Sequence, residues 1–368
     1  RGIFPERFVY QPFYYSVFLP LAMALGGPLW GMGTLQALCA AGVAVLSALI
    51  AARLHSRIAG LIAAALCVFS QMLFFYVPYA LIEIQQCLWI TLLAWLVLRA
   101  MDSRTLFSWA CAGLVFAFAI LSRGNAWLLL PSILVALLLS GTGLFRRRRL
   151  LFCVVFLAAA LLPQIPFAWR NTCADGSLSG PSAAGPAVLA IGNNPEGAPG
   201  GLPVPYPETY ESWMRHADEI SIPRRILTWA REEPLAFLLQ QAQKTLLFWD
   251  AREIPNNIDL QWNARESKAF ALFGFVPTSA LLLFSLSACF LALPRLRGKP
   301  RFLFLILFLA SYALATSAFY LLARFRVPIL GVLAALSGIF LASLLSAVGK
   351  RLTVSTTLRQ TIAPPKPR

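Results

Sequence analysis

The sequence predicts an all-α polytopic membrane protein. Of its 368 residues, 59% are hydrophobic and only 12% are charged, whereas soluble domains have roughly 45–50% apolar and about 25% charged residues. Runs of about 20 apolar residues recur along the chain, and this is the length a helix needs to cross the hydrocarbon core. On a soluble chain the net charge of +16 would suggest binding to nucleic acid. In a membrane protein, basic residues between spans indicate which side of the bilayer each connection faces, so no nucleic-acid partner is expected.

We expect about nine transmembrane helices and an interfacial N-terminal helix. The apolar segment 12–29 comes first, but prolines and Gly26-Gly27 interrupt it, which favours an interfacial or re-entrant helix over a straight span. The predicted spans are 33–52, 58–80, 84–100, 105–121, 126–143, 150–169, 270–293, 302–322 and 327–348.

The basic residues predict the orientation, because they gather on alternate connections between spans. These connections hold Arg53 and Arg57, Arg99 and Arg104, Arg146 to Arg149, the run 295–301 and the tail 350–368. Lysine and arginine concentrate on the cytoplasmic side of membrane proteins. We therefore expect a multi-pass protein of a bacterial inner (plasma) membrane with a cytoplasmic C-terminus. On the other face acidic and basic residues balance, and that face is the expected active side.

The longest connection, 170–268, lies on this extracytoplasmic face. It greatly exceeds a normal inter-helix turn, so we expect a loop domain there. Apolar residues recur at helical spacing over 208–220 and 223–249, and Pro234 suits the start of a new helix. The expected organisation is a transmembrane module at 1–169, this loop domain at 170–268, C-terminal transmembrane helices at 269–349 and a cytoplasmic basic tail at 350–368.

Glu83 is the only acidic residue between positions 8 and 101. A carboxylate at the outer end of a span could ligate a divalent cation such as Mg²⁺ or Mn²⁺, hold an acceptor, or act as a base. The alternative is an interfacial carboxylate that stabilises the N-terminus of the next helix. The sequence leaves these roles open.

Arg123, Arg324 and Arg326 lie at the outer ends of spans, against the positive-inside trend. The planar guanidinium donates hydrogen bonds in pairs and suits phosphate oxygens, so these residues are candidates to bind a lipid phosphate. The alternative for any one of them is an arginine that extends to ordinary lipid headgroups.

Two polar segments of the long connection are candidate sugar-binding loops. Glu253, Asn256 and Asn257 lie in the first, and Asn193 and Asn194 lie in the second. Their dense hydrogen-bonding groups match the needs of a sugar, although solvated turns explain them almost equally well. Neither has the glycine pattern of a nucleotide-binding loop.

Taken in order, these segments resemble the GT-C type membrane glycosyltransferases, the superfamily related to dolichyl-phosphate-mannose protein mannosyltransferases (glycosyltransferase family 39). The segments that carry the resemblance are Tyr10 to Pro12, Glu83, Leu121 to Asn125, Trp169 to Asn171, Gly192 to Pro195, Phe248-Trp249 with Glu253 to Asn257, and Ala323 to Pro328. The resemblance runs across nearly the whole chain.

The resemblance implies transfer of a hexosyl or pentosyl unit from a polyprenyl-phosphate donor to an extracytoplasmic lipid, glycan or protein. In such enzymes the acid that activates the acceptor precedes the segment matching Tyr10 to Pro12, so we expect the base upstream of Arg1. Gly124 replaces the family's usual proline, and Val77 and Tyr79 stand where relatives often have acids, which leaves metal dependence open.

The alternative is a polyprenyl-lipid or polysaccharide transporter or flippase, or a ligase-like assembly protein. Transport would favour inverted repeats and ion-coupling acids inside the spans, and the sequence has neither.

Overall fold

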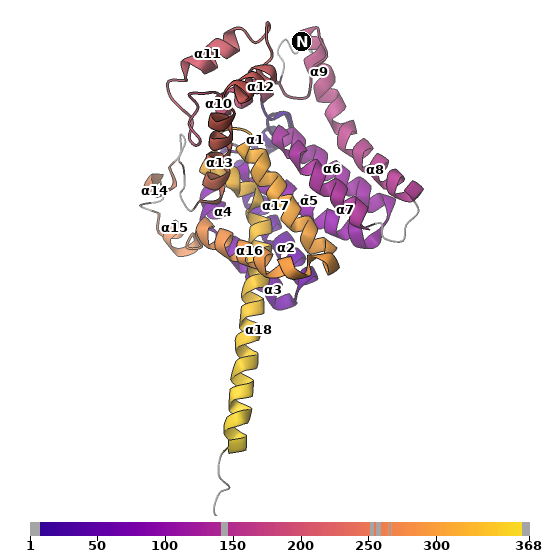
Figure 1. Cartoon of the computed structure of the whole chain (residues 1–368), viewed down its shortest axis with the longest axis vertical. Helices are drawn as coiled ribbons and strands as arrows, with labels where there is room; N and C mark the ends of the chain where they lie inside the picture. The colour runs from indigo at the N-terminus through magenta and orange to yellow at the C-terminus, as the bar shows by residue number, and fades with distance from the viewer. Residues whose placement is uncertain are drawn as a thin grey trace, which may run out of the picture.

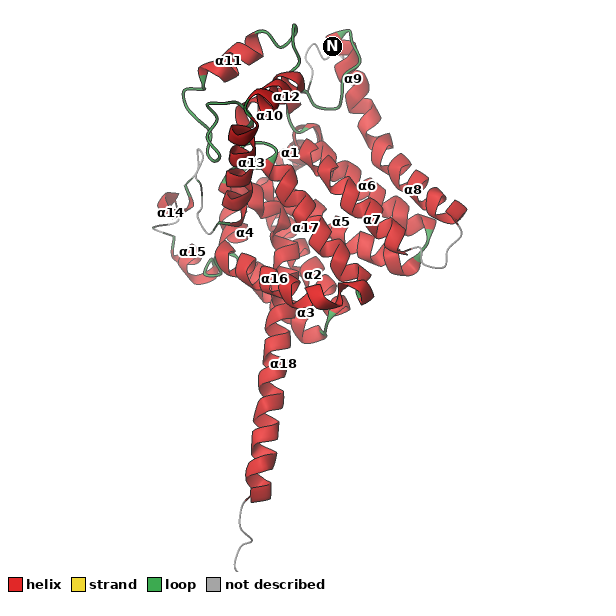
Figure 2. Ribbon diagram, in the orientation of Figure 1, coloured by secondary structure: helices red, strands yellow, loops and turns green. Residues whose placement is uncertain are grey.

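Helices joined by loops make up the part of the chain that its computed structural model describes, which comprises residues 8–140, 146–250, 254, 259–263, 265 and 267–362 (Figures 1 and 2). No strand forms within those ranges, and isolated bridges pair Ser70 with Val276 and Gly200 with Leu321. Helices satisfy their backbone hydrogen bonds internally, as a chain in lipid must. The predicted all-α polytopic fold is confirmed.

The membrane bundle begins with two short helices, η1 and α1, and continues with longer helices and the short helical turns between them. Their bounds are η1 Tyr14–Phe18, α1 Leu19–Ala24, α2 Trp30–Leu54, α3 Arg57–Val68, α4 Gln71–Tyr76, α5 Glu83–Ser103, α6 Leu106–Ser122, η2 Gly124–Leu129, α7 Leu130–Ser140, α8 Arg146–Leu161, η3 Leu162–Gln164, α9 Ile165–Asp175, α16 Thr278–Ala292, η4 Leu293–Gly298, α17 Pro300–Ser317, η5 Ala323–Ile329 and α18 Leu330–Ile362.

Among the described residues, five helical stretches are long and apolar enough to cross a membrane: Trp30–Leu54, Glu83–Ser103, Arg146–Asp175, Pro300–Ser317 and Ala323–Gly349. The other predicted spans correspond to shorter apolar helices at Arg57–Val68, Leu106–Ser122, Gly124–Ser140 and Thr278–Ala292.

The expected span at 58–80 is two helices instead of one. Helix α3 ends at Val68, and Ser70 begins α4 by accepting a hydrogen bond from the Leu73 amide. On either side of this break the Gln71 amide donates to the Val276 carbonyl and the Val276 amide donates to the Phe69 carbonyl, so tertiary pairing stabilises it.

Helices α1 and α2 form a tight hairpin at the N-terminus. Gly26 and Gly27 have φ angles of 141° and 76°, which few residues other than glycine adopt, and they end α1. A Cβ at Gly31 would overlap the Ala22 carbonyl oxygen, so the two helices meet backbone to backbone. The expected break at the prolines and glycines is therefore present.

Small residues let α18 pack closely in the centre of the bundle. A Cβ at Gly338 would lie 2.5 Å from the Ala59 carbonyl oxygen of α3. The Ser47 hydroxyl of α2 donates to the Gly331 carbonyl at 2.8 Å. Small side chains and interhelical hydrogen bonds hold helices together where lipid offers little hydrophobic driving force.

The two ends of the bundle differ in character. At one end Asp102 accepts hydrogen bonds from Arg53 Nε and Arg301 Nε, each at 2.7 Å, and these three residues come from three different helices. Helix α18 extends beyond the bundle at the end opposite two helices of the long connection, α11 (Glu208–Arg215) and α12 (Ile222–Glu232) (Figure 1). The basic connections of Arg53, Arg104, Arg148 and Arg301 are thus joined at one end, as predicted.

The long connection packs on the opposite end. It contains α10 Gly185–Gly192, α11 Glu208–Arg215, α12 Ile222–Glu232, α13 Pro234–Trp249, α14 Leu260–Asn263 and α15 Lys268–Phe273. We call this part the loop domain. Pro234 begins α13, as predicted. The helical stretch from Arg146 continues to Asp175 and so passes the expected boundary at residue 169.

The close packing at Gly338 predicts a steric cost for any larger residue. We expect Gly338→Ala to lower the free energy of unfolding by roughly 1–3 kcal/mol, because the added methyl group meets the α3 backbone. Thermal unfolding of the protein in detergent measures this cost. Gly349→Ala is the matched control on the same helix, since a Cβ there has no neighbour within 4 Å. Equal unfolding temperatures for both variants would contradict the packing.

Candidate functional site

Glu83, Arg123 and Arg324 meet at the end of the bundle next to the loop domain. Glu83 is the first residue of α5, Arg123 caps the end of α6, and Arg324 lies in the η5 turn that leads into α18. Arg123 Nη2 lies 3.5 Å from Glu83 Oε1, and Arg324 Nε lies 3.6 Å from the same oxygen. We call these three residues the arginine–glutamate cluster.

The cluster is largely withdrawn from solvent. The Glu83 side chain is 1% exposed, while those of Arg123 and Arg324 are 16% and 20% exposed. Glu83 Oε2 and Arg123 Nη1 are buried and have no hydrogen-bond partner. Because an unsatisfied buried charged group is costly, these atoms mark a place where a polar ligand would be stabilised.

The Phe325 ring lies beside both arginines. Its centroid is 4.3 Å from Arg123 Cζ and 5.7 Å from Arg324 Cζ, which is within cation–π distance. The Phe325 carbonyl accepts a hydrogen bond of 3.0 Å from the Tyr312 hydroxyl, which fixes the turn to α17. Sequence reasoning missed Phe325, although an aromatic residue between two arginines was a visible signal.

The surroundings of Glu83 do not fit a divalent cation. Mg²⁺ and Mn²⁺ prefer several oxygen ligands, but the nearest charged partners of this carboxylate are two guanidinium groups. No group of three His, Cys, Asp or Glu residues that could hold a metal occurs within the described ranges. We therefore derive no step through a metal at Glu83.

Arg326 has a different position from the other two arginines. It is buried, and its Nη1 donates to the main-chain oxygen of Asp250, just after α13. This contact joins η5 to the loop domain. The predicted phosphate-binding role of Arg326 therefore has no support in this geometry.

Asn193 and Asn194 are buried and hydrogen bonded to the backbone. Asn193 Nδ2 donates to the carbonyls of Leu189 and Ala318 at 2.9 and 2.8 Å. Asn194 Nδ2 donates to the carbonyls of Ala190 and Ile191 at 2.8 and 3.1 Å. Both amides stabilise the loop, which leaves their predicted sugar-binding role without support. The other predicted sugar contacts, Glu253, Asn256 and Asn257, lie outside the described residues.

Lys244 is a buried cation that sequence reasoning missed. From α13 its Nζ donates to the Gly192 carbonyl at 2.8 Å and to Asn193 Oδ1 at 2.9 Å. Burial lowers the pKa of this amine to about 7, because desolvation penalises the charged form. One lysine in an amphipathic helix carries no sequence signal for such a role.

The loop domain is fixed against the segment that carries Arg324. A Cβ at Gly192 would overlap the backbone of Phe319 and Tyr320, so only glycine allows this approach. Asn193 bonds the Ala318 carbonyl, and the Gly201 amide donates to the Leu321 carbonyl at 2.8 Å. These contacts hold residues 318–321 directly before η5 and thereby position Arg324.

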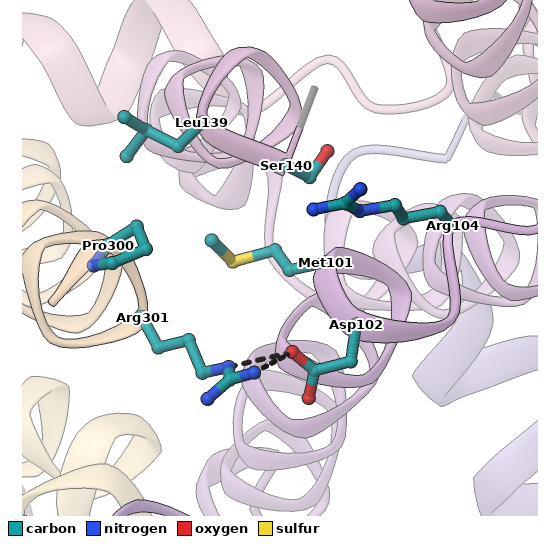
Figure 3. Close-up of a pocket in the computed structure, with 7 residues that line it drawn as sticks. All are labelled: Met101, Asp102, Arg104, Leu139, Ser140, Pro300 and Arg301. Atoms are coloured by element: carbon teal, nitrogen blue, oxygen red, sulfur yellow. Dashed lines mark hydrogen bonds and ion pairs between the residues drawn. The ribbon is translucent and has the colours of Figure 1, made fainter. Parts of the chain in front are cut away.

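A polar cavity of about 380 Å³ lies at the opposite, basic end of the bundle (Figure 3). It is lined by Met101, Asp102, Arg104, Leu139, Ser140, Pro300 and Arg301. Glu83 and Asp102 lie near opposite ends of the 21-residue helix α5, which is about 30 Å long at 1.5 Å per residue. Asp102 and Arg301 on the wall of the cavity are 21% and 47% exposed, whereas Glu83 is 1% exposed, so the arginine–glutamate cluster is the stronger candidate site.

Comparisons with known proteins agree with this fold. Residues 10–168 match the family of dolichyl-phosphate-mannose-protein mannosyltransferase. A search of curated proteins found no match. The chain is similar in structure to the Archaeoglobus fulgidus oligosaccharyltransferase in its apo form, with a TM-score of 0.53, 17% identity and coverage of 96% of this chain and 44% of that chain.

Two further structures of the A. fulgidus oligosaccharyltransferase show the same likeness. The complex with Zn and sulfate has a TM-score of 0.53 and 16% identity, and covers 96% of this chain and 43% of that chain. The form tethered to an acceptor peptide has a TM-score of 0.52 and 16% identity, and the match covers 95% of this chain and 42% of that chain. The chain thus spans less than half the length of these relatives.

Fold and site together define a multi-span membrane protein with a loop domain over a buried pair of arginines. The family match over residues 10–168 agrees with the predicted resemblance in that part of the chain, and the solved structures share its fold.

The buried Lys244 predicts that stability depends on pH. Its pKa is about 7 in the folded protein and near 10.4 in the unfolded chain, so the unfolded state binds more protons between these values. The free energy of unfolding therefore rises as the pH increases from about 7 towards 10. Thermal unfolding between pH 6.5 and 9 measures this, with Lys244→Met expected to flatten the rise. A wild-type profile as flat as that of the variant would contradict it.

Proposed function

We propose that the chain is an integral membrane glycosyltransferase that moves a sugar from a polyprenyl-phosphate donor to an extracytoplasmic acceptor. The observation that carries the proposal is the convergence of Arg123 and Arg324 on one buried carboxylate beside the loop domain. The name of the matched family specifies a dolichyl-phosphate-linked mannose and a protein acceptor, which supports the same donor class.

Both arginines suit the phosphate of such a donor. Arg123 Nη1 is buried without a hydrogen-bond partner, and Arg324 Nε approaches Glu83 Oε1 only at 3.6 Å, longer than an ordinary hydrogen bond. Both groups can therefore donate to phosphate oxygens. Phe325 limits the movement of the two guanidinium groups and keeps them directed at one place.

The transfer converts the phosphodiester of the donor into a phosphate monoester, which carries more negative charge. The acceptor oxygen or nitrogen bonds to the anomeric carbon, and the bond from that carbon to the phosphate oxygen breaks with its electron pair left on the phosphate. A singly charged diester thus becomes a monoester with about −1.5 to −2 charges at pH 7. Arg123 and Arg324 stabilise this growing charge in a site of low dielectric.

The acceptor also loses a proton, which requires a base. Glu83 is sealed from solvent and engaged by both arginines, so we assign the proton to a base outside the arginine–glutamate cluster. The transferred sugar is a hexosyl or pentosyl unit, and the acceptor is a protein, lipid or glycan.

We further propose that the loop domain faces the extracytoplasmic side of a bacterial inner membrane. The basic connections that share Asp102 then face the cytoplasm, as the positive-inside trend requires. In this orientation Arg123 and Arg324 lie in the outer leaflet region, within reach of the phosphate of a membrane-anchored donor.

Removal of either arginine tests the proposed donor site. We expect Arg324→Gln and Arg123→Gln each to lower kcat/KM at least about 100-fold, the scale found when a single transition-state donor is removed. The measurement uses purified full-length protein in liposomes with a panel of polyprenyl-phosphate sugars.

Arg231→Gln is the control, because this exposed arginine of α12 lies in the loop domain away from the cluster. Normal turnover by a folded Arg324→Gln variant would refute the assignment. Movement of the donor lipid across the bilayer without sugar transfer would instead support a flippase.

A further inference from the structure

We propose that Glu83 determines which charge state of lipid phosphate the site retains. It keeps the net charge of the arginine–glutamate cluster at +1, so the cluster favours a singly charged phosphodiester donor over the doubly charged monoester product. This inference rests on the proposed function and assigns Glu83 a role in specificity and product release instead of proton transfer.

The first support is the way in which both arginines share one carboxylate. Arg123 and Arg324 approach the same atom, Glu83 Oε1, at 3.5 and 3.6 Å. Two guanidinium groups and one carboxylate leave one positive charge uncompensated within the cluster. Both distances exceed those of ordinary N–H···O hydrogen bonds, so the arginines can donate to another anion while Glu83 stays between them.

The second support is that the neighbouring tyrosines add no charge to this balance. Tyr14, Tyr312 and Tyr320 lie within electrostatic reach of the cluster, but tyrosine hydroxyls are neutral near pH 8. Arg326 follows Arg324 by two residues and keeps its own positive charge, but its Nη1 is directed at the Asp250 main-chain oxygen at the end of α13.

The third support is burial, because a difference of one charge on the ligand has a larger effect on its binding free energy in a buried site than in water. Charges interact several-fold more strongly in a partly buried site than in water. A phosphodiester of charge −1 neutralises the cluster, whereas a dianionic monoester leaves one negative charge in excess. An uncompensated buried charge is expensive, so the product is bound less tightly than two arginines alone would bind it.

This role explains why a site for an anion contains an acid at all. A carboxylate weakens the binding of any phosphate, which has no benefit if tight binding is the only requirement. It is useful when the anion that leaves is more negative than the one that arrives, as the transfer chemistry requires. Donors linked through pyrophosphate carry a second negative charge and are disfavoured by the same argument.

The test compares two probes on purified full-length protein in nanodiscs at pH 8. One probe is a polyprenyl methyl phosphate, a monoanionic diester, and the other is the polyprenyl monophosphate, a dianion at this pH. We expect the wild type to bind the diester more tightly. Glu83→Gln keeps an oxygen for both arginines but removes the charge, and should raise the monoester-to-diester affinity ratio at least about 10-fold, or 1.4 kcal/mol.

Kinetics provide a second readout that a base or metal ligand would not give. We expect Glu83→Gln to lose more steady-state turnover than single-turnover rate, with stronger inhibition by the monoester, because product release becomes slow. Glu83→Asp keeps the charge and should restore the wild-type ratio. Asp102→Asn is the matched control, since Asp102 also lies between two arginines but at the other end of the bundle, and its ratio should equal that of the wild type.

If Glu83→Gln does not fold, the pH dependence of lipid binding by the wild type tests the proposal instead. Below about pH 6 the monoester is a monoanion, so its affinity relative to the diester should rise as the pH falls from 8 to 5.5. A wild type that prefers the monoester at pH 8, or a folded Glu83→Gln with an unchanged ratio, would overturn the inference. If neither lipid binds, or Arg324→Gln binds both normally, the proposed function itself fails.

Discussion

The ion pairing of one buried carboxylate with two arginines determines how this end of the molecule is built. A buried charge is tolerated only when its partners are close, so Glu83 requires the end of α6 and the start of the η5–α18 segment at the same point. Position 83 begins α5, position 123 ends α6 and position 324 precedes α18. The helices that meet here also form the centre of the bundle, so site and core share one framework.

The loop domain completes this framework by fixing the backbone before η5. Lys244 and Asn193 join α13 to the turn after α10, and the same turn contacts the main chain at residues 318–320. These contacts are formed by buried amides and a buried amine, and they cannot slide as apolar contacts can. The position of Arg324 therefore depends on residues of the loop domain that do not touch the cluster.

The helices and the polarity of the two ends could be predicted from sequence, because apolar length and the placement of arginines are local signals. The break at Phe69–Ser70 could not, since its reason is backbone pairing with Val276, far away in the chain. Arg123, Arg324 and Arg326 were predicted together at one face, but the convergence of the first two on Glu83 depends on tertiary structure. Asn193, Asn194 and Arg326 have the residue types of a binding site, and only the structure shows that their donors are used by the backbone.

The two ends of the bundle contain the same three charges in different surroundings. Asp102 lies between Arg53 and Arg301 with side-chain exposures of 21%, 36% and 47%, whereas Glu83, Arg123 and Arg324 are 1%, 16% and 20% exposed. At the exposed end water and salt screen the excess positive charge, so the triad joins helices and adds little stability beyond that. At the buried end the same excess charge is poorly screened, so it attracts an anionic ligand more strongly. Burial, and not the choice of residues, therefore separates a structural contact from a binding site in this fold.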